Sequence, residues 1–417
     1  MTPKREHRHL IGRAGWNIVD QGLSAMTNFV MAFIIARNVS AEEFGQFSVA
    51  FLVFTLVIGV QRALIGSPLS INYSAVVGEG RRHAACDSFG AVLWLTLPVS
   101  VGLLVTAAIT AGTARETWFI LAMFMPLLIG QDVCRMAFIA WERPQLATLN
   151  DAVWTVIQFT LIAAVIASWH VSAATMVLTW GVAAGVAAVL GMLQLRAWPD
   201  LRGGLKWLRA NVGVSGYLLA EYLLGVGTFQ GGILIFGSFL GVTDVGSLRA
   251  AQVLTGPLGI LAQAVFAFGV PEIARRRLPA RPMWLSAMAS AGLVTIAVLY
   301  TVALLLMPDT WGEALLGETW DGARAVLLPV ALTSVAACGK LGPSIIVYGL
   351  GHASRTFRLN VVLATSATVF MLAGAVLGGV DGLAWGMFAS QALVLPLWFR
   401  QAGKSVRLER LEASAAQ

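Results

Sequence analysis

The chain has 417 residues, of which 58% are hydrophobic and only 12% are charged. Soluble domains carry about 25% charged residues, so the composition predicts a membrane protein with many spans and excludes a separate soluble domain. Three cysteines are scattered through apolar sequence without metal-ligand spacing, and we expect neither a disulfide framework nor a metal site. They are Cys86, Cys134 and Cys338.

The basic N-terminus, residues 1–13, looks like the start of a signal peptide. The apolar segment that follows is too long and too polar for one and lacks a small-residue cleavage site, so we expect a retained first span. Twelve segments are long enough to cross about 30 Å of hydrocarbon. Their expected bounds are 14–36, 46–66, 88–112, 117–140, 151–169, 172–195, 213–239, 248–270, 284–307, 323–349, 358–379 and 383–400.

The first span carries a polar stripe with the spacing i, i+4, i+7 and i+11, which places its members on one helical face. The stripe consists of Asn17, Gln21, Ser24 and Asn28, and Asp20 and Thr27 flank it. A charged residue near the centre of a membrane helix costs about 2.5–3.5 kcal/mol on the insertion scale, so it normally faces protein or water. We therefore expect this helix to line a polar interior.

The polar stripe has a counterpart 201 positions later in the chain. The matching pairs are Asp20 with Glu221, Thr27 with Thr228, and Gly45 with Gly246. An acid, an apolar residue and a glycine also recur in order, at 43–45 and 244–246. The repeat predicts two six-helix bundles, 1–205 and 206–417, related by a pseudo-two-fold axis along the membrane normal. Chance similarity is the alternative, because apolar helices align easily.

The lysines and arginines predict the orientation. With the N-terminus in the cytoplasm, four of the 28 basic residues fall on the outer side and the other 24 on the inner side. The outer four are Arg37, Arg115, Arg249 and Arg324. The positive-inside rule then places both termini in the cytoplasm. The net charge of +7 reflects topology and contact with anionic membrane lipids, so we expect no nucleic-acid partner.

Two stretches resemble a known family. The first is FIIARNVSAEEFGQFSVAFLVFTL, at 33–56. The second combines Gln131, Asp132, Arg135, Phe138, Arg143, Pro144, Asp151 and Trp154. Both resemble bacterial polysaccharide exporters and O-antigen-type (Wzx-like) flippases of the multidrug/oligosaccharidyl-lipid/polysaccharide (MOP) exporter superfamily.

The resemblance implies a protein of the bacterial cytoplasmic membrane that works by alternating access through a central polar cavity. The implied substrate is an undecaprenyl-diphosphate-linked oligosaccharide, moved from the inner to the outer leaflet. A glycan polymerase or another polysaccharide-assembly protein is the implied protein partner.

Cationic side chains would offset the diphosphate charge during such transport. The candidates are Arg62, Arg135 and Lys340, and the candidates for the glycan are Asn17, Gln21 and Asn28. Two alternatives stay open. Arg62 can snorkel to the membrane interface, and Arg135 can neutralise Asp132 at i, i+3.

Asp20, Glu221 and Asp132 are candidate coupling or inter-bundle acids. A buried carboxylate can take up a coupling proton or bind Na⁺. Asp20 and Glu221 can instead pair with Arg62 or another cation and hold the two halves together, or they can form solvated walls of the cavity. We expect no other cofactor.

Two other functions are compatible with a chain of this class. A cation-coupled drug exporter of the same superfamily would need an apolar, aromatic-rich cavity, which the polar stripe disfavours. A polysaccharide polymerase or ligase would need a long outer loop with catalytic charges, whereas 308–322 is short and acidic. Trp311 and Trp320 in this loop are typical of an interfacial aromatic belt, and glycan stacking is their alternative role. No nucleotide-binding loop is present, so we expect a transporter and not an enzyme.

Overall fold

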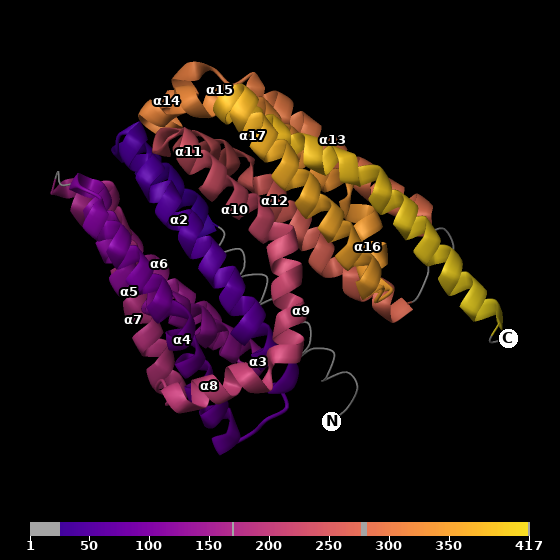
Figure 1. Cartoon of the computed structure of the whole chain (residues 1–417), viewed down its shortest axis with the longest axis horizontal. Helices are drawn as coiled ribbons and strands as arrows, with labels where there is room; N and C mark the ends of the chain where they lie inside the picture. Colours follow the sequence, from indigo (N-terminus) through magenta and orange to yellow (C-terminus); the bar gives the residue numbers. More distant parts are fainter. Residues whose placement is uncertain (1–25, 169–170, 277–281, 416–417) are drawn as a thin grey trace. The chain divides into compact units, whose positions relative to one another are not determined.

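The computed structural model describes residues 26–168, 171–276 and 282–415, and within these ranges every regular element is a helix (Figure 1). The chain divides into two compact units, Met1–Leu223 and Leu224–Gln417. The sequence repeat places the boundary between residues 205 and 206, whereas this division falls inside the apolar span Val212–Leu240.

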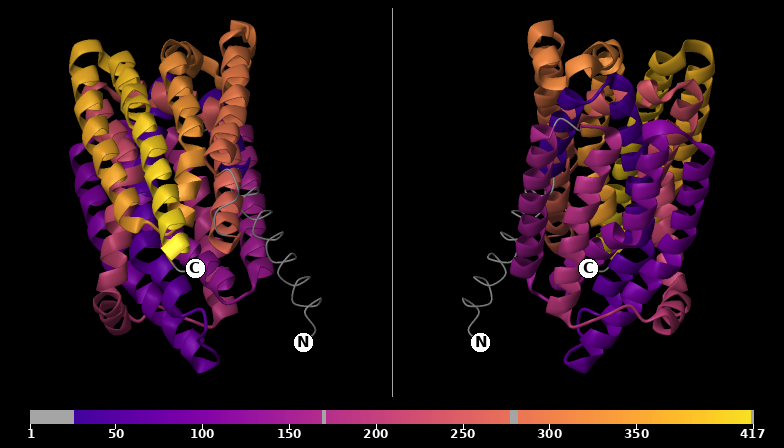
Figure 2. Two further views of the ribbon diagram at one scale, coloured as in Figure 1. Left: turned by 90° about the vertical axis from the view of Figure 1, so that its right-hand side faces the viewer. Right: turned by 90° about the vertical axis from the view of Figure 1, so that its left-hand side faces the viewer.

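The first unit is built from long helices that run alongside one another (Figure 2). A helical segment at 26–38 comes first. The elements that follow are α2 (Ala41–Gln61), η1 (Arg62–Gly66), α3 (Ser67–Asn72), α4 (Glu79–Ile109), α5 (Gly112–Ala140), α6 (Pro144–Ala167), α7 (Ala173–Leu195), α8 (Leu201–Ala210) and α9 (Val212–Tyr222).

The second unit follows directly along the chain. Its elements are η2 (Leu223–Gly227, which begins at the last residue of the first unit), α10 (Thr228–Gly232), η3 (Ile233–Gly237), α11 (Ser238–Leu240), α12 (Val242–Arg276), α13 (Pro282–Leu305), α14 (Asp309–Leu316), η4 (Gly317–Thr319), α15 (Trp320–Gly339), α16 (Leu341–Gly349) and α17 (Ala353–Ala415).

The described chain contains ten helices that are long and apolar enough to cross a membrane. This confirms an all-α polytopic membrane protein, while the count of twelve stays a prediction. The expected first span, 14–36, lies partly outside the described residues. The expected spans 358–379 and 383–400 both fall in α17, which has non-helical dihedrals at Gly378 and Gly379. The φ of +60° at Gly379 favours glycine.

The repeated acid–apolar–glycine motif begins a helix in each unit. In α2, the N-cap Ser40 accepts a hydrogen bond from the backbone N–H of Glu43, and Glu43 complements the positive helix end. In α12, Asp244 lies in the first turn. The apolar residues of the two motifs, Phe44 and Val245, are fully buried. The motif therefore sets a helix start and anchors it in a core.

The core of the first unit includes an aromatic cluster between α2 and α7. The ring of the buried Trp180 lies 4.6 Å from Phe54 and 5.7 Å from Phe51, centroid to centroid. Such pairs add about 0.5–1.5 kcal/mol beyond the apolar area that they bury. They fix the face that α2 presents to α7.

Helix α8 forms between the expected spans 172–195 and 213–239. At ten residues it is too short to span a membrane, and it runs across the direction of its long neighbours (Figure 1). Trp207 is buried while Arg202, Lys206 and Arg209 are exposed, as in helices that lie in a membrane interface.

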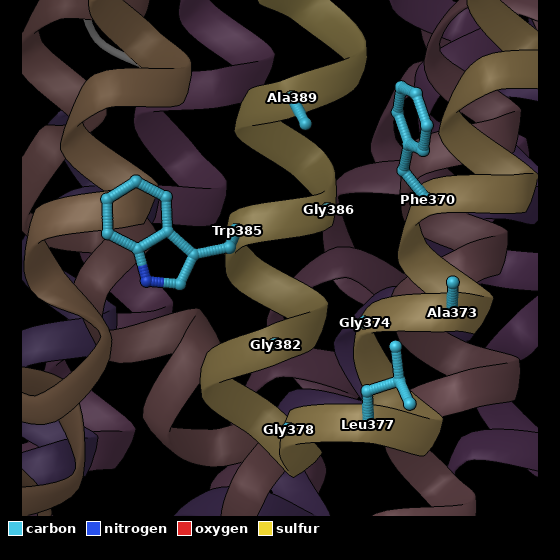
Figure 3. Close-up of a pocket in the computed structure, with 9 residues that line it drawn as sticks. All are labelled: Phe370, Ala373, Gly374, Leu377, Gly378, Gly382, Trp385, Gly386 and Ala389. Carbon is cyan, nitrogen blue, oxygen red and sulfur yellow. The ribbon is translucent and has the colours of Figure 1, made fainter.

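In the second unit, the two arms of α17 on either side of Gly378 and Gly379 pack through small residues (Figure 3). A Cβ at Gly374 would lie 2.0 Å from the carbonyl oxygen of Gly382, and one at Gly386 would lie 2.3 Å from that of Phe370. Close backbone approach of this kind is common between membrane helices. The groove beside this contact is lined by apolar residues and glycines, so it offers nothing to a charged ligand.

Candidate functional site

Two arginines and two aspartates form an ionic network inside the first unit. The guanidinium of Arg62 donates to both carboxylate oxygens of Asp132, from Nε at 3.0 Å and from Nη2 at 2.6 Å. Arg135 lies between two acids, with Nη1 3.6 Å from Asp132 Oδ1 and Nε 3.4 Å from Asp151 Oδ2. The network thus joins η1, α5 and α6.

Neutral amides extend the network toward α7. Gln131 Nε2 donates to Asn150 Oδ1 at 3.0 Å and to Asp151 Oδ1 at 2.8 Å. Asn150 Nδ2 in turn donates to the carbonyl oxygen of Ala187 at 2.8 Å. All three polar side chains are buried. Buried charges normally occur in hydrogen-bonded networks of this kind, because an unpaired charge loses its hydration without compensation.

Local backbone features position these groups. A π-helical turn, Arg62–Gly66, interrupts the long helix just at the arginine, and such turns are frequent at functional sites. Asp132 and Arg135 share one face of α5 through their i, i+3 spacing. Pro144 occupies the first turn of α6 and has no N–H to lose there, which places Asp151 two turns further on.

The network is neutral overall, because its two guanidinium groups balance its two carboxylates. Its members differ in exposure: the side chain of Arg62 is 45% exposed, whereas those of Asp132, Arg135 and Asp151 are between 3% and 7% exposed. Arg62 is therefore the part of the network that a ligand could reach. Beside it, Gln61 is fully buried, and its amide finds no hydrogen-bond partner among the described residues.

Lys340 has a different environment, in the second unit. It forms the junction between α15 and α16, and its Nζ donates to Gln391 Oε1 of α17 at 2.8 Å. No carboxylate of the described residues pairs with it, and its chain neighbours Cys338 and Leu341 belong to a hydrophobic cluster. Lys340 is thus a half-buried membrane cation held by a neutral amide.

The polar stripe is only partly visible. Asn17, Asp20 and Gln21 lie outside the described residues. Asn28 is exposed and lines a small cavity of about 30 Å³ with Thr27, Asp151 and Thr155. The hydroxyls of Thr27 and Thr155 lie 3.1 Å apart. A cavity of this size holds one or two water molecules.

Glu221 is half-buried on α9. The next residue, Tyr222, donates a hydrogen bond from its hydroxyl to the carbonyl oxygen of Thr55 at 3.0 Å. Glu221 therefore lies on a helix segment that is fastened to α2 within the first unit.

Sequence reasoning did not assign a role to Asp151, Gln131 or Asn150. Gln131 and Asp151 belong to the residues that carry the family resemblance, and that resemblance was the signal that could have marked them as part of the site. The i, i+3 spacing identified Arg135 as a partner of Asp132. It could not identify Arg62, which is 70 positions away in the chain.

The two tryptophans of the segment 308–322 differ in environment. Trp320 is 1% exposed, and its Nε1 donates to Asp309 Oδ1 at 3.1 Å. The Arg324 guanidinium lies 5.5 Å from the centroid of the same indole, so this ring packs within the protein. Trp311 is 66% exposed and is the aromatic side chain of the pair that can meet a membrane interface.

Solved structures share this fold. A multidrug resistance MATE family transporter of the MOP superfamily, in an inward-facing conformation, matches with a TM-score of 0.69 and 14% identity over 94% of this chain and 98% of its own. Lipid II flippase MurJ in an inward closed conformation matches with a TM-score of 0.70 and 10% identity, covering 93% of this chain and 87% of its own. These likenesses show that the chain has the fold of these membrane transporters.

The sequence profile of a family described as "Polysaccharide biosynthesis protein" matches residues 12–276. The chain belongs to this family. It is also 24% identical over 407 residues to the succinoglycan biosynthesis transport protein ExoT of Rhizobium meliloti (strain 1021), covering 92% of this chain and 78% of that protein. The family match confirms the expected resemblance to polysaccharide-biosynthesis proteins, and the relative is named as a transport protein.

Proposed function

We propose that this transporter moves an undecaprenyl-diphosphate-linked oligosaccharide from the inner to the outer leaflet of the bacterial cytoplasmic membrane by alternating access. Family membership and the similarity to a succinoglycan biosynthesis transport protein support a polysaccharide substrate. The fold shared with a lipid II flippase supports a lipid-linked form of it. In this proposal a polysaccharide-assembly enzyme uses the product on the outer side.

The environment of Lys340 carries the proposal. A charged side chain at the centre of a membrane helix costs about 2.5–3.5 kcal/mol on the insertion scale, and charged residues within membrane spans are normally retained for function. Gln391 satisfies one ammonium proton but leaves the positive charge uncompensated. A diphosphate supplies the missing negative charge through charge-assisted hydrogen bonds. Arg135 is less suited to this role, because Asp132 and Asp151 already neutralise it.

Substituting Lys340 tests the diphosphate contact. In proteoliposomes with a fluorescent undecaprenyl-diphosphate disaccharide, we expect Lys340→Gln to lower the flipping rate by about ten- to a hundredfold, as for the loss of a charged hydrogen bond. Lys340→Arg should retain part of the rate. The exposed Lys404, also in the second unit, gives the control Lys404→Gln. Equal rates for Lys340→Gln and the wild type would contradict the proposal.

Transport in this proposal is coupled to a proton or to Na⁺ through carboxylates. Protonation of Asp132 or Asp151 would leave the network with a net positive charge. It would also weaken the electrostatic attraction between the network and Arg62, the most exposed of the four charged residues. Asp20 and Glu221, at equivalent places in the repeat, are the other candidate coupling acids.

Asp20→Asn and Glu221→Gln separate coupling from structure, because each keeps size and polarity but removes the charge. If these acids couple transport to an ion, each variant should lose gradient-driven flipping while it still binds the labelled lipid. If they hold the protein together, each should lower the melting temperature in detergent, and the double variant should lower it by less than the sum. Normal flipping and normal stability would exclude both roles.

A further inference from the structure

An apolar groove lies between α4 and α5, beside the turn that joins these two helices. Its volume is about 580 Å³, which is within the range of small-molecule sites. Its walls come from both helices, with Leu104 and Ala107 on α4 and Phe119 and Ile120 on α5. Phe119 is 51% exposed, and Val105, which follows Leu104 in the chain, is 58% exposed. This side of the helix pair therefore faces the hydrocarbon of the membrane.

Two opposite charges line the groove at its end near the turn. Arg115 and Glu116 are consecutive residues of α5, and both are exposed. Helix α5 begins at Gly112, so at about 1.5 Å of rise per residue both lie within about 6 Å of the helix start. The end of a membrane helix lies at the level of the lipid headgroups. An apolar wall thus meets a pair of charges at headgroup depth.

Helix capping accounts for only part of this arrangement. Arg115 Nε donates to the carbonyl oxygen of Thr110 at 3.0 Å, and Thr110 is the C-cap residue of α4. Capping uses one edge of the guanidinium group. No carboxylate of the described residues forms an ion pair with Arg115, which leaves the remaining N–H groups able to bind an oxyanion. Capping also gives no reason for a groove of this size between the helices.

We propose that the groove between α4 and α5 binds one phospholipid with a zwitterionic, ethanolamine-type headgroup. One acyl chain would lie along the apolar walls, the phosphate would contact Arg115, and the ammonium would contact the Glu116 carboxylate. A guanidinium group matches a phosphate in shape and charge. Both side chains line the same groove, so one can contact the phosphate and the other the ammonium of a single headgroup.

The same charges disfavour an anionic lipid. In an anionic lipid no ammonium would neutralise Glu116, which would then face the phosphate or a second negative charge. Like charges repel. Among the residues that the structure describes, Arg115 is the one cation that lines the groove. The site therefore differs from a polybasic surface, which attracts anionic headgroups.

Native mass spectrometry of the full chain in a mild detergent tests the site. Phosphatidylethanolamine and phosphatidylglycerol with identical acyl chains would be titrated separately. The wild type should retain phosphatidylethanolamine preferentially. Arg115→Gln should weaken binding of both lipids about tenfold, because a charged hydrogen bond to phosphate is lost. Glu116→Gln should abolish the preference for phosphatidylethanolamine over phosphatidylglycerol and should strengthen binding of phosphatidylglycerol.

Two further variants make the test specific. Ala108 lines the groove and is exposed, so Ala108→Trp should fill the groove and displace both lipids without disturbing a core. Arg358 provides a control, because its Nε also donates to a carbonyl oxygen near it in the chain. Arg358→Gln should leave the retention of both lipids unchanged. Equal retention of both lipids by the wild type, or unchanged retention in Arg115→Gln and Ala108→Trp, would show only ordinary surface lipid and would overturn the proposal.

Discussion

Asp132 is held by two arginines, one on its own helix and one on η1. Its side chain is 3% exposed, so hydration cannot replace a lost partner. Removing one member of such a pair leaves the other charge buried without a partner, which typically destabilises the protein by about 3–5 kcal/mol. The ionic network therefore supports the structure of the first unit, whatever part Arg62 plays in transport.

A double-mutant cycle tests this role. We expect Asp132→Asn and Arg62→Gln each to lower the melting temperature in detergent and the amount of protein in the membrane. The double variant should lose less than the sum of the two, because neither residue then leaves an unpaired partner. Strictly additive losses would show that the 2.6 Å contact between Arg62 and Asp132 contributes little to stability.

Glycine positions decide how closely the elements of the second unit pack. Gly374 and Gly382 bring the backbones of the two arms of α17 together. The substitution Gly374→Ala would place a methyl group 2.0 Å from a carbonyl oxygen, which belongs to rigid backbone. The helices would have to separate, and such overpacking typically costs about 1–3 kcal/mol.

We therefore expect Gly374→Ala to lower the melting temperature of the purified protein. Gly292, inside α13, is the matched control, since a Cβ there would meet no atom within 4 Å. Gly292→Ala should be neutral or should stabilise the protein by about 0.5–1 kcal/mol, because alanine has the higher helix propensity. Similar effects of the two substitutions would mean that the arms of α17 do not pack as closely as the structure shows.

At the scale of the whole molecule, the distribution of basic residues predicts which side of the membrane each loop occupies. The 24-to-4 division of lysines and arginines places both termini and 196–212 in the cytoplasm, and 308–322 outside. The exposed arginines and lysine of α8 agree with a position at a cytoplasmic interface.

Reporter fusions to truncated chains test this topology. A fusion after Gly204 should be active with a cytoplasmic reporter, and one after Gly317 should be active with an external reporter. A fusion at the C-terminal end should report cytoplasm. If the Gly204 and Gly317 fusions report the same side, the orientation and the number of intervening spans are wrong.

Local sequence patterns were enough to predict the class of protein and the places of most helices. The expected spans 172–195 and 284–307 correspond to Ala173–Leu195 and Pro282–Leu305. These features are local, because a run of about 20 apolar residues must form a helix in lipid, where every backbone group needs an internal partner. The resemblance at 33–56 likewise pointed to polysaccharide exporters, and the family match over residues 12–276 confirms a polysaccharide biosynthesis protein.

Which polar groups meet became visible from the packing of the folded chain. It paired Asp132 with Arg62, left Lys340 with an amide, and buried Trp320 while Trp311 stayed exposed. It also placed Arg115 and Glu116 at the end of an apolar groove. These outcomes depend on the rotation and tilt of each helix against its neighbours. Packing between helices sets these angles, and hydropathy carries little information about them.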